Sequence, residues 1–135
     1  PYYDPAGTAA QDEGRDRALR EAIPLEDWIA ACLKRLKPSG WLTIIQAADR
    51  LPEVLRALQA SAGSITALPI APRAGRSARR VIVWARKGSG GSFQLLAPFI
   101  LHAATRHERD GEDFTHEARA VLRNGAAISR ESWKE

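Results

Sequence analysis

The chain has 135 residues, of which 44% are hydrophobic and 27% are charged, with 20 Lys and Arg against 16 Asp and Glu. This composition excludes a disordered tail and is typical of one folded domain or of part of a larger one. No apolar run reaches the roughly 20 residues of a membrane span. The single cysteine, Cys32, excludes an intrachain disulfide, which suits a reducing cytoplasm. No charged-then-apolar signal is found at the start of the sequence.

The first half of the chain predicts helices and strands in alternation. Residues 11–22 are dense in charge and predict a polar, solvated helix or a mobile segment. From residue 24 to 36, apolar side chains recur at helical spacing and predict an amphipathic helix. The apolar run 41–48 predicts a strand that is buried on both faces. Residues 51–60 predict a second amphipathic helix, and residues 64–71 predict a second strand.

A third strand is predicted at residues 79–86, after a basic loop at 73–78. The helix–strand–helix–strand order before this loop indicates right-handed crossovers between parallel strands, with helices covering the sheet. The loop is too short for such a crossover, so the strands on either side of it are expected to pair antiparallel. The sequence therefore predicts an α/β fold with a mixed sheet whose last strands run against the rest.

The end of the chain predicts one more strand and one more helix. Residues 93–101 form an apolar segment, which Pro98 restricts to an edge strand or a bulge. A short helix is expected at 114–123, with Thr115 as its N-cap and Gly125 as its stop.

Two motifs and the order of the elements resemble the second half of the class I S-adenosylmethionine-dependent methyltransferases. The turn at residues 36–41 (LKPSGW) resembles the Leu-Lys-Pro-Gly-Gly turn before their fifth strand, and Pro1-Tyr2 resembles the end of the Asn-Pro-Pro-Tyr motif after their fourth strand. In that fold the final strand is inserted antiparallel. The resemblance implies a Rossmann-like methyltransferase fold, of which residues 1–135 are the C-terminal portion, without the cofactor-binding N-terminal half.

More narrowly, the chain resembles the bacterial family that methylates the exocyclic amine of an adenine in valine transfer RNA. This resemblance implies tRNA as the partner and S-adenosyl-L-methionine as the cofactor, with the cofactor site mostly in the missing half. The stretches that carry it, in chain order, are PYYD at 1–4, the helix with Trp28-Ile29, the strand at 79–86, FILH at 99–102 and FTHEA at 114–118.

Pro1 and Tyr2 are the catalytic residues that this resemblance implies. In the family, the Asn and the Pro carbonyl of the motif accept the two hydrogens of the amine, and an aromatic ring stacks on the flipped base. Such stacking contributes about 1–3 kcal/mol. Tyr2 would be that ring and Pro1 would stiffen the loop. Without the motif, Tyr2 reads as a surface residue of a chain terminus.

Six basic residues predict an RNA-binding surface. No acidic residue interrupts the segment that holds them, and a phosphate backbone is the natural partner of such a cluster. The alternative is a solvated hairpin whose charges protect a sheet edge from aggregation. The six are Arg73, Arg76, Arg79, Arg80, Arg86 and Lys87.

The remaining polar candidates favour no further chemistry. His102, His107 and His116 lack a compelling ligand spacing, so no metal site is expected. Asp49 follows the first strand, where ligands gather in such sheets, but capping the next helix is the simpler interpretation. Cys32 lies on an apolar helix face and is expected in the core.

The three tryptophans in regular elements are expected to pack rather than to stack on bases. They are Trp28, Trp41 and Trp84.

Two other functions remain open at this point. Enzymes that methylate a glutamine amide in release factors use the same Asn-Pro-Pro-Tyr motif, although the basic loop favours RNA. A non-catalytic RNA-binding fragment is the other. Whatever the function, the sheet edge left by the missing strands should be apolar, and we expect the protein's own N-terminal half, a second copy or a rearrangement to cover it.

Overall fold

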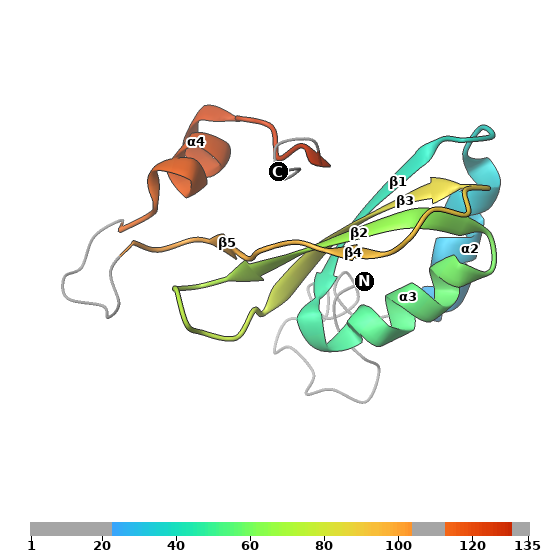
Figure 1. Cartoon of the computed structure of the whole chain (residues 1–135), viewed down its shortest axis with the longest axis horizontal. Coiled ribbons are helices and arrows are strands. Elements are labelled where there is room, and N and C mark those ends of the chain that lie inside the picture. Colours follow the sequence, from blue (N-terminus) through green and yellow to red (C-terminus); the bar gives the residue numbers. More distant parts are fainter. Residues whose placement is uncertain (1–22, 104–112, 131–135) are drawn as a thin grey trace, which may run out of the picture.

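The computed structural model describes residues 23–103 and 113–130 (Figure 1). The polar helix expected at 11–22 lies outside these ranges. None of the described helices has the length and apolar composition of a membrane span. The elements are α2 (Leu25–Arg35), β1 (Trp41–Ala47), the 3-10 turn η1 (Ala48–Arg50), α3 (Leu51–Gln59), β2 (Ala62–Ala71), β3 (Arg80–Lys87), β4 (Gln94–Leu95), β5 (Phe99–Ile100) and α4 (His116–Asn124).

The strands form one mixed sheet in the order β1-β3-β2-β4, and β5 also pairs with β2. β3 lies between β1 and β2 and is antiparallel to both, with Val83 opposite Ile44 on one side and Ala67 on the other. β1 and β2 therefore run parallel to each other. The predicted antiparallel pairing around the basic loop is confirmed.

The strands after β3 differ from the sequence expectation. β4 and β5 both pair with β2 in parallel, so the prediction that the last strands run against the rest is right for β3 and wrong for β4 and β5. The chain turns at the amino end of β2 and returns along its outer edge, which restores the direction of β2. Residues 96–98 separate the two short strands, and Pro98 has no N–H for the ladder.

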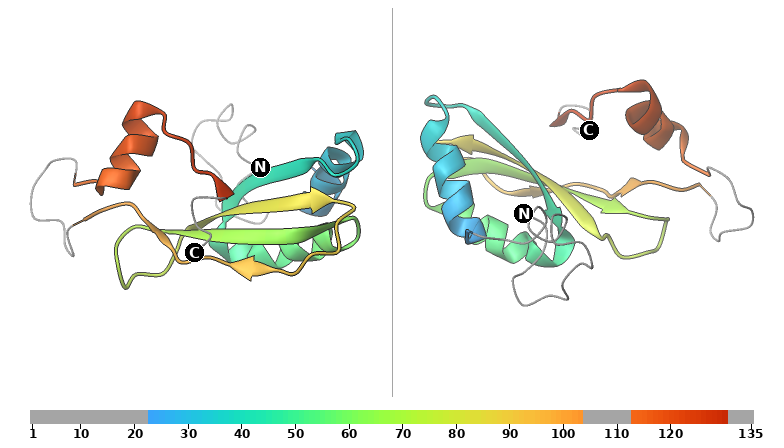
Figure 2. Two further views of the ribbon diagram at one scale, coloured as in Figure 1. Left: turned by 45° about the horizontal axis from the view of Figure 1, so that its top comes forward. Right: turned by 180° about the vertical axis from the view of Figure 1, so that it is seen from behind.

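Two apolar clusters lie on opposite faces of the sheet (Figures 1 and 2). α2 and α3 cover one face, and α4 with the chain after it covers part of the other. The first cluster contains Leu25, Ile29 and Leu33 of α2, Val54 and Leu58 of α3, and Leu42, Ile44, Ala67, Val81 and Val83 of the strands. The second contains Leu68, Trp84, Phe99 and Ala118, with Ile128 packed against them.

The predicted ends of α4 are confirmed. The Thr115 hydroxyl accepts a hydrogen bond from the Ala118 N–H at 3.0 Å and donates one to the Ile100 carbonyl at 2.9 Å. One side chain therefore caps the helix and ties it to β5. Gly125 ends the helix with φ 68°, a left-handed conformation that glycine adopts without strain.

β1 is buried on one face only. Leu42, Ile44 and Gln46 are buried under the helices, whereas Trp41 and Ile45 on the other face are 37% and 42% exposed. The expectation of a strand buried on both faces is therefore wrong for the described residues, because they place helices over only one face of β1. The Arg130 guanidinium lies 3.8 Å from the centre of the Trp41 ring and is a partial cover.

The other apolar candidates pack to different degrees. Trp84 is buried in the second cluster, as expected. Trp28 is 37% exposed, so it packs on one side only. Cys32 is partly buried against the first cluster, which agrees with the core position expected for it.

Candidate functional site

The parallel strands β1 and β2 end at the same edge of the sheet. Their last residues are Ala47 and Ala71. In open α/β sheets, ligands bind beyond the carboxyl ends of the strands, so we take this carboxyl edge as the candidate site.

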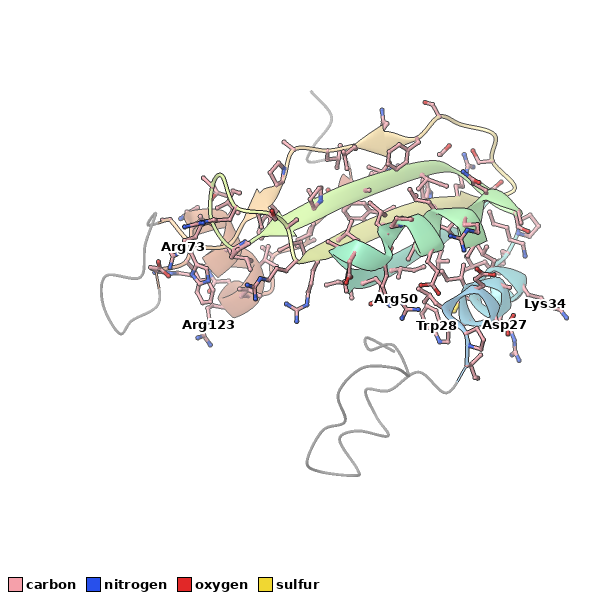
Figure 3. The ribbon with its side chains drawn as sticks, turned by 90° about the horizontal axis from the view of Figure 1, so that it is seen from below. Asp27, Trp28, Lys34, Arg50, Arg73 and Arg123 are labelled. Atoms are coloured by element: carbon pink, nitrogen blue, oxygen red, sulfur yellow. The ribbon has the colours of Figure 1, made fainter. Side chains whose placement is uncertain are left out.

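At the end of β1, the chain passes through η1 before α3 begins. Arg50, not Asp49, occupies the N-cap position of α3, and no side chain caps the helix there. The capping role expected for Asp49 is therefore wrong, since the extra 3-10 turn moves it away from the cap. Asp49 is exposed. Arg50 instead binds Glu53 through two hydrogen bonds of 2.9 and 2.8 Å, and Figure 3 shows Arg50 on the side of the sheet that carries α2.

At the end of β2, a short basic loop leads into β3. The Arg76 N–H donates to the Arg73 carbonyl at 3.1 Å, and Gly75 takes φ 69° inside this turn. The side chains of Arg76, Arg79 and Arg80 are exposed. Since residues 72–80 contain no acidic residue, the loop presents a local positive field.

A second segment lies beside this loop. After β5, the His102 N–H donates to the Pro72 carbonyl at 2.9 Å, which continues the parallel pairing beyond β2. His102 and Phe114 form an isolated antiparallel bridge, flanked by a 2.8 Å hydrogen bond from the Ala103 N–H to the Asp113 carbonyl. We call residues 101–103 and 113–115 the edge hairpin.

One carboxylate joins the basic loop to the edge hairpin. Asp113 Oδ2 accepts a hydrogen bond from Arg73 Nη1 at 2.6 Å, and Oδ1 lies 2.6 Å from His102 Nδ1. The Arg73, Asp113 and His102 side chains are 14%, 25% and 28% exposed. The His102 ring stacks on the Phe114 ring, with centroids 5.1 Å apart and planes 17° apart.

The electrostatics of this cluster favour an ionised Asp113. The hydrogen bond from Arg73 lowers the pKa of Asp113 most; desolvation opposes it, and the interaction with His102 lowers the pKa further. An ionised carboxylate holds two cationic or donor groups together, so it orients both side chains.

The six basic residues predicted to bind RNA separate into two groups. Four of them, from Arg73 to Arg80, lie at the carboxyl edge, and Figure 3 shows Arg73 at the end of the molecule that carries α4. Arg86 and Lys87 lie at the far end of β3, an 8-residue strand that spans roughly 25 Å. There Arg86 Nε donates to the Ser39 carbonyl and Lys87 Nζ to the Leu36 carbonyl, at 3.2 and 2.8 Å.

Lys87 therefore caps the end of α2, and Arg86 holds the turn between α2 and β1. The carbonyls at a helix C-terminus lack partners and carry partial negative charge. The structure therefore brings together four of the six predicted residues at the candidate site.

From the sequence, Asp113 had no expected role, and the only chemical role considered for His102 was that of a metal ligand. Asp113 bonds to residues 40 and 11 positions away in the chain, so no local periodicity marks the cluster. The sequence does contain one indication of the hairpin. Apolar residues 99–101 precede His102 and Phe114-Thr115 follow Asp113, so the two segments could have been predicted to pair.

The other predicted site residues lie outside the described ranges. These are Pro1, Tyr2 and His107. Within residues 23–103 and 113–130, no group of three or more His, Cys, Asp or Glu side chains could hold a metal ion.

The described residues do not fit a cofactor site of the S-adenosylmethionine type by themselves. Their one junction from a strand of the sheet directly into a helix runs through residues 47–51 and contains no glycine. A side chain at each position keeps a ligand away from the backbone, whereas glycine-rich turns let it approach. The cradle would have to come from outside these residues.

Comparison with known proteins identifies the fold. No protein-family model matches the sequence, and no curated protein matches it. Among solved structures, a predicted O-methyltransferase from Agrobacterium tumefaciens is similar, with a TM-score of 0.70 and 30% sequence identity. The match covers 78% of this chain and 48% of that one, so the chain spans about half the length of this neighbour. The chain has a Rossmann-like methyltransferase fold with a mixed sheet.

Proposed function

We propose that this chain is the C-terminal portion of an S-adenosylmethionine-dependent methyltransferase that modifies the exocyclic amine of an adenine in tRNA. The observation that carries the proposal is the antiparallel β3 between the parallel strands β1 and β2. This topology agrees with the inserted final strand expected from the sequence resemblance. The similarity to a predicted O-methyltransferase supports methyl transfer as the reaction class.

Charge at the carboxyl edge supports RNA as the substrate. Arg76, Arg79 and Arg80 are exposed there without a neighbouring acidic residue in the loop. Arginines in this arrangement neutralise phosphates, which supplies the sequence-independent part of RNA binding. Tyr2, through its Pro-Tyr motif, is the proposed stacking residue for the target base.

The open edge of β1 supports a missing partner half. Among the described residues, β1 pairs only with β3. It contains no charged residue and no proline, the usual devices that protect an exposed edge. Trp41 and Ile45 leave apolar surface on its uncovered face. We propose that the cofactor-binding N-terminal half packs along β1, and a second copy of this chain is the competing occupant.

Methyl transfer to oxygen is a second candidate, because the solved neighbour is a predicted O-methyltransferase. An oxygen acceptor in RNA would be a ribose hydroxyl. The basic loop supports either RNA acceptor, so only the position of the new methyl group separates the two.

The test uses the full-length protein with radiolabelled S-adenosylmethionine and unmodified tRNA. Digestion to nucleosides is expected to give N6-methyladenosine. A Tyr2→Ala variant should lose about tenfold or more in kcat/KM, since it loses base stacking, whereas Tyr2→Phe should retain most activity.

Other products would redirect or overturn the proposal. Label in a ribose 2′-O-methyl group would support the second candidate. A parallel reaction replaces tRNA by a release factor, and label in its glutamine would show a protein substrate. No transfer to any of these acceptors would contradict the methyltransferase proposal. We expect the 135-residue chain alone to be inactive.

A further inference from the structure

We infer that His102 binds the RNA backbone and accepts a hydrogen bond from a ribose 2′-hydroxyl, next to the arginines that bind the phosphates. This inference rests on the proposed tRNA substrate and adds a residue that distinguishes RNA from DNA. It follows from how the edge hairpin holds the imidazole ring.

The ring of His102 is held in one orientation. Asp113 Oδ1 lies 2.6 Å from Nδ1, and Phe114 stacks on one face of the ring at 5.1 Å. An ionised carboxylate can only accept, so Nδ1 carries the hydrogen, and in the neutral ring Nε2 carries the lone pair. The side chain is 28% exposed, and within the described residues no hydrogen bond reaches Nε2. In its neutral form, the ring therefore offers an oriented acceptor at Nε2.

Asp113 also fixes where this acceptor lies. Its other oxygen binds Arg73 of the basic loop at 2.6 Å, and the His102 N–H binds the Pro72 carbonyl at 2.9 Å. The imidazole thus lies beside the loop that presents Arg76 and Arg79. In the proposed complex, a nucleic-acid strand that crosses this loop with a phosphate on Arg76 also passes His102, which is hydrogen-bonded to the start of the loop at Pro72.

A hydrogen-bond acceptor such as the lone pair on Nε2 binds only a group that can donate a hydrogen. A phosphate offers only acceptor oxygens to the lone pair of a neutral imidazole, so no hydrogen bond forms between them. The 2′-hydroxyl is the donor that every ribose of an RNA strand carries and that DNA lacks. An oriented Nε2 of the neutral ring therefore suits the 2′-hydroxyl, which an RNA backbone offers and a DNA backbone lacks.

The test compares an RNA hairpin with a DNA hairpin of the same sequence, bound by the full-length protein in fluorescence anisotropy. His102→Asn is the informative variant, because its amide nitrogen lies where Nδ1 lies and can still donate to Asp113, while Nε2 is removed. His102→Ala removes both. Arg76→Ala/Arg79→Ala reports on phosphate binding, and Arg35→Ala, at the exposed end of α2, is the control for the loss of a positive charge.

We expect His102→Asn to weaken RNA binding about tenfold, as for removal of one good hydrogen bond, and to leave DNA binding unchanged. Arg76→Ala/Arg79→Ala should weaken RNA and DNA alike and lower the salt slope by about 1 for each phosphate that the variant no longer binds. Thermal melting of each variant verifies the fold, and His102→Asn should melt close to the unsubstituted protein.

Three outcomes would overturn the inference. If His102→Asn binds RNA like the unsubstituted protein while His102→Ala does not, His102 has only a structural role. If His102→Asn weakens RNA and DNA equally, the side chain does not bind the 2′-hydroxyl. If the unsubstituted protein binds no RNA at all, the proposed RNA substrate is wrong and this site with it.

Discussion

The two edges of the sheet differ in how the chain completes them. Along the outer edge of β2, the chain itself adds β4, β5, the edge hairpin and α4. Along β1, the described residues add no strand, and Trp41 and Ile45 stay more than a third exposed. Figure 2 shows the long segment that follows β3 running back beside β2.

Apolar side chains on the same face of the sheet are therefore buried to different degrees near the two edges. Leu68 and Trp84 are as apolar as Ile45 and Trp41. However, Phe99 and Ala118 pack against Leu68 and Trp84 and bury them. Within residues 23–103 and 113–130, no comparable apolar cluster covers the side chains on this face of β1. Among the described residues, β4 and β5 extend the sheet along β2, whereas no further strand pairs with β1.

The largest expected effect separates the two edges directly. Phe99→Ala, at 5% exposure in the second cluster, should lower the free energy of unfolding by about 3–5 kcal/mol. Ile45→Ala, at 42% exposure, should change it by no more than about 0.5 kcal/mol in the isolated chain. Urea denaturation of both variants measures this. Equal decreases would show that the β1 face is already buried, for example in a dimer.

A smaller effect is expected where the chain leaves β3 and crosses to the outer side of β2. A Cβ on Gly63 would lie 2.1 Å from the Ser89 carbonyl oxygen, so the two backbone segments must separate. Gly63→Ala should therefore cost about 1–3 kcal/mol of stability. Gly90→Ala is the matched control, since a Cβ there meets no atom within 4 Å. Similar melting temperatures for both variants would contradict the close approach.

The smallest effect concerns the ion pair that attaches the edge hairpin to the basic loop. The pKa of Asp113 is lowered below its ordinary 3.8, mainly by the Arg73 hydrogen bond. The folded state therefore gains stability above pH 3.8 and loses it as the pH falls from there through the lowered value. Asp113→Asn should remove this acid-dependent part. Melting curves of the two proteins across the acidic range should converge at the lowest pH; a constant difference would argue against this linkage.

The prediction of secondary structure from sequence was accurate where the signal was local. Amphipathic spacing located α2 and α3, and the Thr115 and Gly125 positions marked both ends of α4. The short loop after β2 was enough to predict the antiparallel β3, because a few residues cannot form a crossover.

The candidate site was predicted only in part. The run of basic residues indicated the loop at the carboxyl edge, but sequence could not separate Arg86 and Lys87 from it. Arg80 and Lys87 are the first and last residues of β3, and an extended strand of this length places them at opposite ends of the sheet. Asp49 illustrates the same limit, since a single 3-10 turn decides which residue caps α3.

Sequence by itself determined the identity of the elements and the class of the fold, because helical and strand periodicity and turn residues act over a few positions. Tertiary structure alone decided which edge of the sheet was finished and which side chains met at its carboxyl end. Arg73, His102 and Asp113 come from three separate segments, and only the parallel return of β5 along β2 brings them within hydrogen-bonding distance.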